Sequence, residues 1–97
     1  MSGLIASIVR FNGDPEDLLE RFERARGLWI EAQDDDYDRP VFYATCKTDD
    51  GIVIVSGWET EAAHHAFGRR MGPYLQAVGM GRPEHHEHMP IAMFGWD

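Results

Sequence analysis

The chain has 97 residues, 43% of them hydrophobic and 27% charged, a balance typical of one folded domain. Its 17 acidic residues outnumber its 9 basic ones, and the net charge of -8 repels nucleic-acid phosphates and anionic lipid surfaces. Cys46 is the only cysteine, which excludes an intramolecular disulfide and a thiolate metal cage within one chain. No apolar run approaches the roughly 18 residues of a membrane helix. We therefore expect one cytoplasmic domain over 1–97, with no nucleic-acid or membrane partner.

The first half of the chain predicts a strand followed by a helix. Residues Leu4–Phe11 are rich in β-branched and apolar side chains, which is typical of a strand. The alternation of a strand places Ser7 on the face of Ile5, Val9 and Phe11. Asp14 as N-cap and Pro15 at the first helical position then start a helix that runs to about Ala32. The apolar stripe of this helix, expected to pack on a sheet, is formed by Leu18, Phe22, Ala25 and Trp29.

The middle of the chain predicts a loop and then a hairpin. Residues Gln33–Pro40 contain four Asp and end on a proline, which indicates a loop. A calcium loop would need alternating oxygen ligands and a closing Glu at a set spacing, and this segment lacks them. Residues Val41–Lys47 and Ile52–Trp58 flank Asp49-Asp50-Gly51, so they form two antiparallel strands joined by a tight turn.

A second helix and a last strand complete the chain. Thr60 caps a helix through Met71, and Gly72-Pro73 should break or kink it before a final turn from Tyr74 to Val78. Gly79 should end that turn. In the last segment, Pro90–Phe94 has the apolar character of an edge or closing strand.

The order of these elements is β-α-β-β-α-β. It predicts an α+β, ferredoxin-like fold, with an antiparallel sheet that carries both helices on one face. The other face of the sheet then needs cover. Pairing of two such sheets about a twofold axis would supply it, so we expect a homodimer.

Three segments are also similar to sequences of a known superfamily. They read Asn-Gly-Asp-Pro-Glu-Asp-Leu-Leu at 12–19, Thr-Asp-Asp-Gly-Ile-Val-Ile-Val at 48–55, and Gly-Trp-Glu-Thr-Glu-Ala at 57–62 followed by Ala66-Phe67. They resemble the dimeric α/β-barrel superfamily over nearly the whole chain, and within it the small actinobacterial-type relatives of the antibiotic biosynthesis monooxygenase domain. The resemblance implies a dimeric α/β barrel with a pocket between sheet and helices. It also implies one of several chemistries: cofactor-independent oxygenation of aromatic polyketides, haem degradation, lactone isomerisation or polyketide cyclisation.

Two positions depart from branches of that superfamily. The oxygenase branch carries an Asn on the strand leading to its pocket Trp, whereas residues 52–57 read Ile-Val-Ile-Val-Ser-Gly here. The haem-degrading branch carries a His about one helical turn beyond His64, where this chain has Gly68-Arg69. The second departure argues against haem degradation, and we expect no cofactor.

Trp58 and His64 are the main candidates for a catalytic site. The resemblance places Trp58 at the pocket between sheet and helices, although a core Trp that anchors helix to sheet explains it equally. His64 lies at the edge of the helix stripe formed by Ala63, Phe67, Met71 and Tyr74, so it should face the pocket, whereas His65 should not. An imidazole there can exchange a proton with a phenol or enol, or it can serve packing alone.

Other side chains complete this candidate site. Arg10 is the candidate to neutralise an oxyanion, and hydroxyls of Tyr43 and Tyr74 are candidate donors to a substrate carbonyl. Each of these three residues can equally be an edge residue whose polar end reaches solvent. Asn12 can reach the pocket mouth or serve as a turn residue. The remaining expected contacts with a substrate are apolar: Phe22, Phe67 and Met71.

The segment Glu-His-His-Glu-His at 84–88 is the other candidate site. On a strand, His86 and His88 share a face, and two imidazoles can chelate zinc, nickel or copper if His64 or a partner subunit adds a ligand. A solvated terminal segment explains the cluster as well, so we expect no metal.

Three functions follow from these residues. The first is an enzyme that acts without metal or organic cofactor on a small aromatic or polyketide-like molecule, by oxygenation, isomerisation or cyclisation. The second is a protein that binds a small apolar ligand in the same pocket without turnover. The third is a metal-binding dimer built on the histidine cluster.

Overall fold

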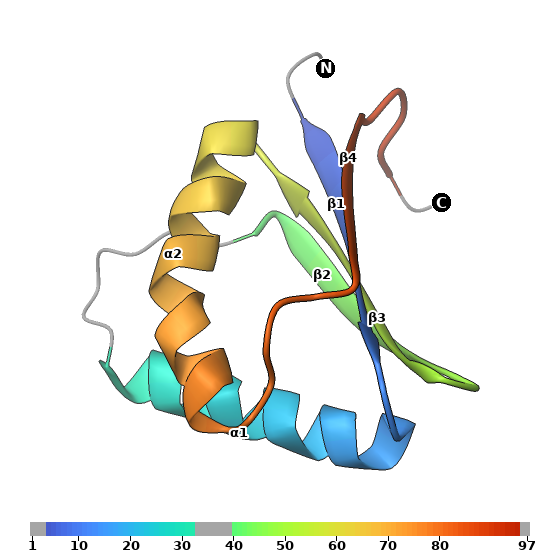
Figure 1. Cartoon of the computed structure of the whole chain (residues 1–97). Coiled ribbons are helices and arrows are strands. Elements are labelled where there is room, and N and C mark those ends of the chain that lie inside the picture. Colours follow the sequence, from blue (N-terminus) through green and yellow to red (C-terminus); the bar gives the residue numbers. More distant parts are fainter. Residues whose placement is uncertain (1–3, 33–39, 96–97) are drawn as a thin grey trace.

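The protein folds as a four-stranded sheet covered on one face by two helices (Figure 1). The structure is a computed structural model that describes residues 4–32 and 40–95. The expected loop at 33–40, with the rejected calcium site, lies outside the described residues except for Pro40. The elements are β1 (Ile5–Asn12), α1 (Pro15–Ala32), β2 (Phe42–Thr48), β3 (Gly51–Trp58), α2 (Glu61–Ala77) and β4 (His85–Pro90).

The sheet has the strand order β2-β3-β1-β4, and all neighbours are antiparallel. This order and the β-α-β-β-α-β sequence of elements confirm the expected ferredoxin-like α+β fold. β1 is an inner strand. It pairs with β3 from Ile5 opposite Trp58 to Asn12 opposite Gly51, and with β4 from Ile5 opposite Pro90 to Arg10 opposite His85.

The face of the sheet toward the helices carries the core. Side chains alternate along a strand, so β1 directs Ser7, Val9 and Phe11 to this face. The buried cluster joins the sheet to both helices through Phe11, Ala25, Trp29, Ile52 and Met71. The expected stripe of the first helix is confirmed, because Ala25 and Trp29 are its buried residues and Leu18 and Phe22 pack beside them.

Helix ends follow the expected capping chemistry. The Asp14 carboxylate accepts a hydrogen bond from the Asp17 backbone N–H at 2.9 Å, and the Thr60 hydroxyl accepts one from the Ala63 N–H at 3.0 Å. α2 ends at Ala77, and Gly79 follows two residues later with a φ of +83°, in the left-handed region that glycine adopts without strain. The sequence predicted all three of these helix termini.

Two expectations about the second half were wrong. α2 runs without a break through Pro73, although we expected a break or a kink there. Its neighbour Gly72 has no Cβ to collide with the proline ring, which removes part of the conflict that usually ends a helix before proline. The last strand is β4 at His85–Pro90, not the apolar Pro90–Phe94. Pairing with β1 decides its position, and Pro90 ends it because proline offers no N–H to the sheet.

The opposite face of the sheet carries a row of apolar residues between strands. Ile8 of β1 lies opposite Val55 of β3, and Ala44 of β2 pairs with Val55 from the other side. Ile8 and Val55 are only partly buried, and Met89 on β4 is 39% exposed. Both helices lie on the other face (Figure 1), so they leave these side chains without cover.

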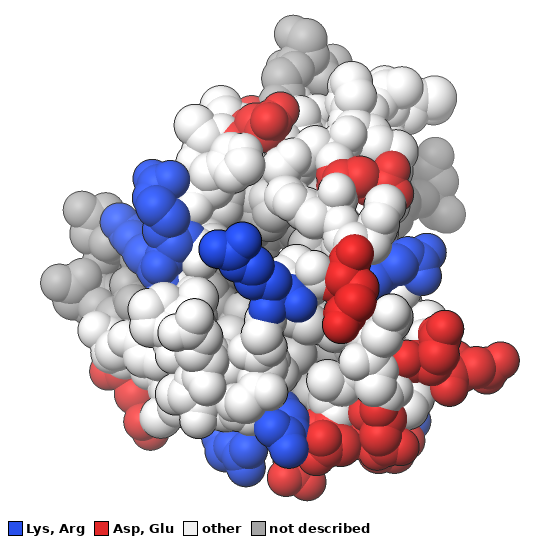
Figure 2. Space-filling model, in the orientation of Figure 1, with Lys and Arg blue, Asp and Glu red and all other residues white. Residues whose placement is uncertain are grey.

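The surface charges are unevenly distributed. Figure 2 shows several acidic side chains over the start of α1 and the β2–β3 turn, while further acidic groups and the Lys and Arg side chains are spread over the rest of this face. Among the described residues, no helix is long and apolar enough to cross a membrane.

Gly51 provides a test of the contact between the β2–β3 turn and β1. A Cβ at Gly51 would collide with the backbone carbonyl oxygen of Phe11, which cannot move without opening the sheet. We expect Gly51→Ala to lower the free energy of unfolding by about 1–3 kcal/mol. The matched control is Gly27→Ala in the exposed part of α1, where a Cβ meets nothing within 4 Å. This change should raise stability by about 0.5–1 kcal/mol. Urea unfolding of both variants checks the pair, and equal midpoints would contradict it.

Candidate functional site

A cavity of about 960 Å³ opens between the sheet and the two helices. This volume lies at the upper end of the range of small-molecule pockets, about 300–1,000 Å³. β1 and β3 supply its floor, and the walls come from α1 and α2. Most of the lining is apolar or aromatic, including Val9, Phe11, Phe22, Ile54 and Leu75. The cavity therefore suits a ligand that buries a large apolar surface.

Three aromatic rings in contact form one wall of the pocket. The ring centroids of Trp58 and Phe67 lie 5.0 Å apart, and those of Trp29 and Phe67 lie 5.2 Å apart in an edge-to-face arrangement. Such contacts fix the rings relative to one another. Trp58 is 2% exposed, and its indole N–H donates to the Ser56 hydroxyl at 2.7 Å. Trp58 thus anchors the core and lines the pocket at the same time.

A polar group lies at one end of this pocket. Ser7, fully buried on β1, has its hydroxyl 3.2 Å from Nε2 of His64 on α2. The other ring nitrogen of His64, Nδ1, lies 2.7 Å from Nε2 of His88 on β4. The imidazole of His64 also lies beside the Trp58 indole, with ring centroids 5.1 Å apart. Both nitrogens are therefore held, and the ring has a fixed orientation between β1 and β4.

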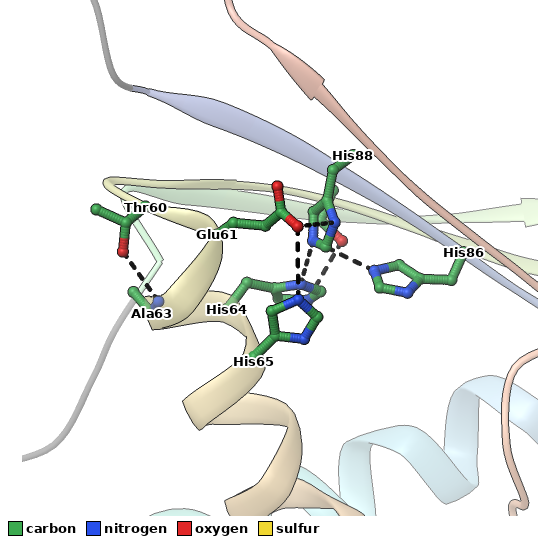
Figure 3. A network of polar contacts seen from close by, with 8 residues as sticks. Thr60, Glu61, Ala63, His64, His65, His86 and His88 are labelled. Atoms are coloured by element: carbon green, nitrogen blue, oxygen red, sulfur yellow. Dashed lines mark hydrogen bonds and ion pairs between the residues drawn. The ribbon is translucent and has the colours of Figure 1, made fainter.

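The polar group extends into a cluster of four histidines and one glutamate (Figure 3). Nε2 of His86 lies 3.3 Å from Nε2 of His88, so two imidazoles approach the same His88 nitrogen. A carboxylate oxygen of Glu61 lies 3.6 Å from Nε2 of His65 and 3.9 Å from Nδ1 of His88. Two sets of three side chains, His64-His86-His88 and Glu61-His65-His88, hold ligand atoms within 4.8 Å of one another.

The cluster favours neutral imidazoles. Burial lowers the pKa of His64, and the neighbouring His88, His86 and His65 lower it further, from 6.5 to about 4. Burial also lowers the pKa of His86, followed by repulsion from other histidines and against the opposing effect of Glu61. His64 is therefore uncharged at pH 7, and the same causes disfavour the charged form of His86, which leaves ring lone pairs available to bind a cation.

The structure brings six of the nine expected site residues to the pocket. They are Phe22, Tyr43, Trp58, His64, Phe67 and Met71. Tyr43 stands at the mouth, 45% exposed, with the Arg26 guanidinium 5.0 Å from its ring centroid. His65, expected to point away, also reaches the rim.

The other three residues lie elsewhere in the described structure. Arg10 extends from β1 on the face opposite to the pocket, because it alternates with Val9 and Phe11. Tyr74 packs against the core cluster and does not line the cavity. Asn12 is exposed at the end of β1, where its backbone N–H donates to Glu84 at 3.0 Å. The pocket positions expected for these three were therefore wrong within one chain.

Sequence reasoning missed other residues at the pocket. Three arginines line it in place of Arg10: Arg26, Arg69 and Arg82. The two buried serines, Ser7 and Ser56, were also missed as partners of His64 and Trp58. A signal for Ser7 was present, since it is a hydroxyl on an otherwise apolar strand face and a buried hydroxyl needs a partner.

Comparisons with known proteins show the fold. No family model matches the chain, and no curated protein matches its sequence. Among solved structures, it is similar to a Chloroflexus aurantiacus J-10-fl protein assigned as an antibiotic biosynthesis monooxygenase. That match has 13% identity, a TM-score of 0.62, and covers 95% of this chain and 97% of the other. SnoaB, a cofactor-independent oxygenase from Streptomyces nogalater, shares 14% identity with a TM-score of 0.54, over 97% and 96% of the two chains.

Rv0793 from Mycobacterium tuberculosis is a third similar structure, with 16% identity, a TM-score of 0.52, and coverage of 96% of this chain and 97% of the other. The matches span nearly the full length of both chains in each pair, so they concern the whole arrangement of sheet and helices. The resemblance inferred from the sequence is therefore confirmed for the fold: this chain shares the ferredoxin-like α+β fold of these solved structures.

Proposed function

We propose that the protein is a small-molecule enzyme of the monooxygenase kind, which binds an aromatic or polyketide-like substrate in the pocket between sheet and helices. The observation that carries the proposal is the cavity of about 960 Å³, with an aromatic wall and one polar end. Apolar pockets with a few convergent polar groups are the usual form of such sites. The similarity in fold to a cofactor-independent oxygenase supports the reaction class.

The aromatic wall is suited to a flat substrate. A ring system that enters the cavity meets the partly buried Phe67, whose ring is held by contacts with Trp29 and Trp58. Offset or edge-to-face contacts contribute about 0.5–1.5 kcal/mol each beyond the buried area. The wall therefore fixes the plane of the substrate, and the polar end determines which of its atoms lies near His64.

His64 is our candidate for the proton acceptor in the metal-free protein. The contact with Ser7 holds the ring, and Nδ1 can accept a proton from an acidic CH₂ or phenol if the substrate takes the place of His88. Three arginines line the cavity, Arg26, Arg69 and Arg82, and their guanidinium groups are the candidates to hold the substrate anion. The anion then reacts with O₂: one oxygen atom enters as a carbonyl, the other leaves as water, and the CH₂ group supplies the electrons.

We also propose that two chains pair through the uncovered sheet face. The support is the row of partly exposed apolar residues on that face, around Ile8 and Val55. An isologous pair of sheets would bury this row twice.

We place the protein in the cytoplasm, which agrees with an exposed free thiol at Cys46.

Pairing predicts a change of oligomeric state in Ile8→Lys. A lysine at the centre of the uncovered face would have to lose its hydration in the dimer, so we expect the dissociation constant to rise at least about tenfold. Sedimentation velocity over a range of concentrations measures this. Leu28→Lys is the matched control, since Leu28 is 40% exposed on α1, away from the sheet face. A monomeric wild-type protein would contradict the pairing.

Ligand binding predicts that a bulky residue at Gly68 blocks the pocket. Gly68 lines the cavity, and a Cβ there meets nothing within 4 Å, so the side chain of Gly68→Trp can start without a clash and should fill part of the cavity. We expect the affinity for anthrone, a tricyclic ketone with an acidic CH₂, to fall at least about tenfold, because one aromatic side chain displaces much of the ligand contact. Quenching of tryptophan fluorescence reports binding. Gly27→Trp on exposed α1 is the control; equal affinities for the two variants would place the ligand elsewhere.

Catalysis predicts a separation of turnover from binding in His64→Ala. If His64 accepts the proton, oxygen uptake with anthrone should fall about 10²–10⁴-fold while anthrone still binds. His85→Ala, at an exposed histidine on the face of β4 turned away from the helices, serves as the control and should retain uptake. Binding without uptake in the wild-type protein would instead favour the second candidate, a carrier of small apolar ligands, which rests on the same cavity.

A further inference from the structure

Three imidazole nitrogens converge at the polar end of the pocket, and hydrogen bonds alone satisfy them poorly. Nε2 of His88 lies 2.7 Å from Nδ1 of His64 and 3.3 Å from Nε2 of His86. A ring nitrogen carries either one proton or one lone pair. If Nε2 of His88 donates, a single proton is shared between two acceptors; if it accepts, two donors compete for one lone pair. A cation at the centre would satisfy all three lone pairs together.

We propose that His64, His86 and His88 form a binding site for a divalent first-row transition-metal ion. Zn–N bonds of about 2.0–2.1 Å in a tetrahedral site put the ligand nitrogens about 3.3 Å apart. The pair His86–His88 is already at that separation. The pair His64–His88 must open by about half an ångström, relative to the same tetrahedral spacing.

The backbone arranges this site from two elements far apart in the sequence. His86 and His88 are two residues apart on β4, so they face the helices together. The register puts His88 opposite Ser7 and His86 opposite Val9 on β1. His64 comes from the first turns of α2, which begins at the end of β3 (Figure 3). The sheet pairing and the helix start therefore fix the relative positions of all three rings.

Neighbouring groups support the required protonation states. A histidine ligand usually donates its second ring N–H to a polar group that orients it. The buried hydroxyl of Ser7, 3.2 Å from Nε2 of His64, can accept that proton and leaves Nδ1 as the ligand atom. The carboxylate of Glu61 lies 3.9 Å from Nδ1 of His88, the nitrogen that carries the proton when Nε2 binds a metal. Glu61 also adds negative charge beside the cation.

The ligand set indicates which ions fit. Three imidazoles favour Zn²⁺, Ni²⁺, Co²⁺ or Cu²⁺, whereas Mg²⁺ and Ca²⁺ prefer oxygen ligands. Both His64 and His86 line the cavity, so a fourth coordination position would face the pocket. Three protein ligands with an open position is the arrangement found in catalytic rather than structural zinc sites.

This site goes beyond the proposed function, which needs no metal. With a metal bound, Nδ1 of His64 is a ligand and is no longer free to accept a substrate proton. Metal binding and the cofactor-independent reaction therefore compete for one atom. Metal binding is measurable without any turnover, so either proposal can fail while the other stands.

The test is a calorimetric titration of the full chain, without a histidine tag and after chelator treatment, with Zn²⁺, Ni²⁺ and Co²⁺. We expect one ion per chain and no comparable binding of Mg²⁺ or Ca²⁺. His64→Ala, His86→Ala and His88→Ala should each weaken Zn²⁺ binding at least about tenfold, because removing a ligand costs at least as much as removing an orienting group. His86 is exposed, so its variant should fold even if the others do not. Thermal unfolding verifies that it does.

Two neighbouring histidines supply matched controls. His85 is next to His86 in the chain but lies on the other face of β4, opposite Arg10, so His85→Ala should bind as the wild type does. His65→Ala separates the proposed site from the set Glu61-His65-His88. Failure to bind any of the three ions would overturn the proposal. So would loss of binding in His65→Ala but not in His86→Ala, an equal loss in His85→Ala, or half an ion per chain.

Discussion

The position of β1 between β3 and β4 is the constraint on which the site depends. Antiparallel pairing on both sides sets which residues of three strands share a face. A shift of one residue in either register would turn every side chain of the shifted strand to the opposite face. His88 would then no longer share a face with Ser7, and the side chains of Ser56 and Trp58 would point away from the cavity. The same pairing that holds the sheet together therefore also assembles the polar end of the pocket.

The buried polar residues determine the shape of that end. Ser7 and Ser56 lie opposite each other on β1 and β3, and each hydroxyl contacts a ring, His64 in one case and Trp58 in the other. A buried hydroxyl without a partner costs free energy, so each serine holds its ring in one orientation. The two rings in turn contact each other at 5.1 Å between centroids. Two small side chains thus position the two residues most closely associated with the proposed chemistry.

The sequence predicted local structure better than it predicted which side chains meet. Caps at Asp14 and Thr60 and the stop at Gly79 depend on neighbours within a few residues, so the sequence alone was sufficient. The position of β4 depended on pairing with a strand about 80 residues earlier. There, apolar content favoured Pro90–Phe94, whereas the structure pairs His85–Pro90. Arg10 was misplaced for a simpler reason: side chains alternate along β1, so Arg10 lies on the face opposite to Val9 and the pocket.

The histidine cluster and the pocket beside it both lower the stability of the fold. Burial and repulsion from the neighbouring rings both lower the pKa of His64. The fold therefore holds together imidazoles that oppose one another's protonation. Hydrophobic side chains of similar volume would fill the same space without that cost. The open cavity of about 960 Å³ beside the cluster adds to this cost, since apolar side chains that line an open pocket are removed from water less completely than those in a closed core. In a chain of 97 residues, where the buried core is small, both features oppose stability. Their occurrence together at one end of the sheet is what a binding site, and not a core, requires.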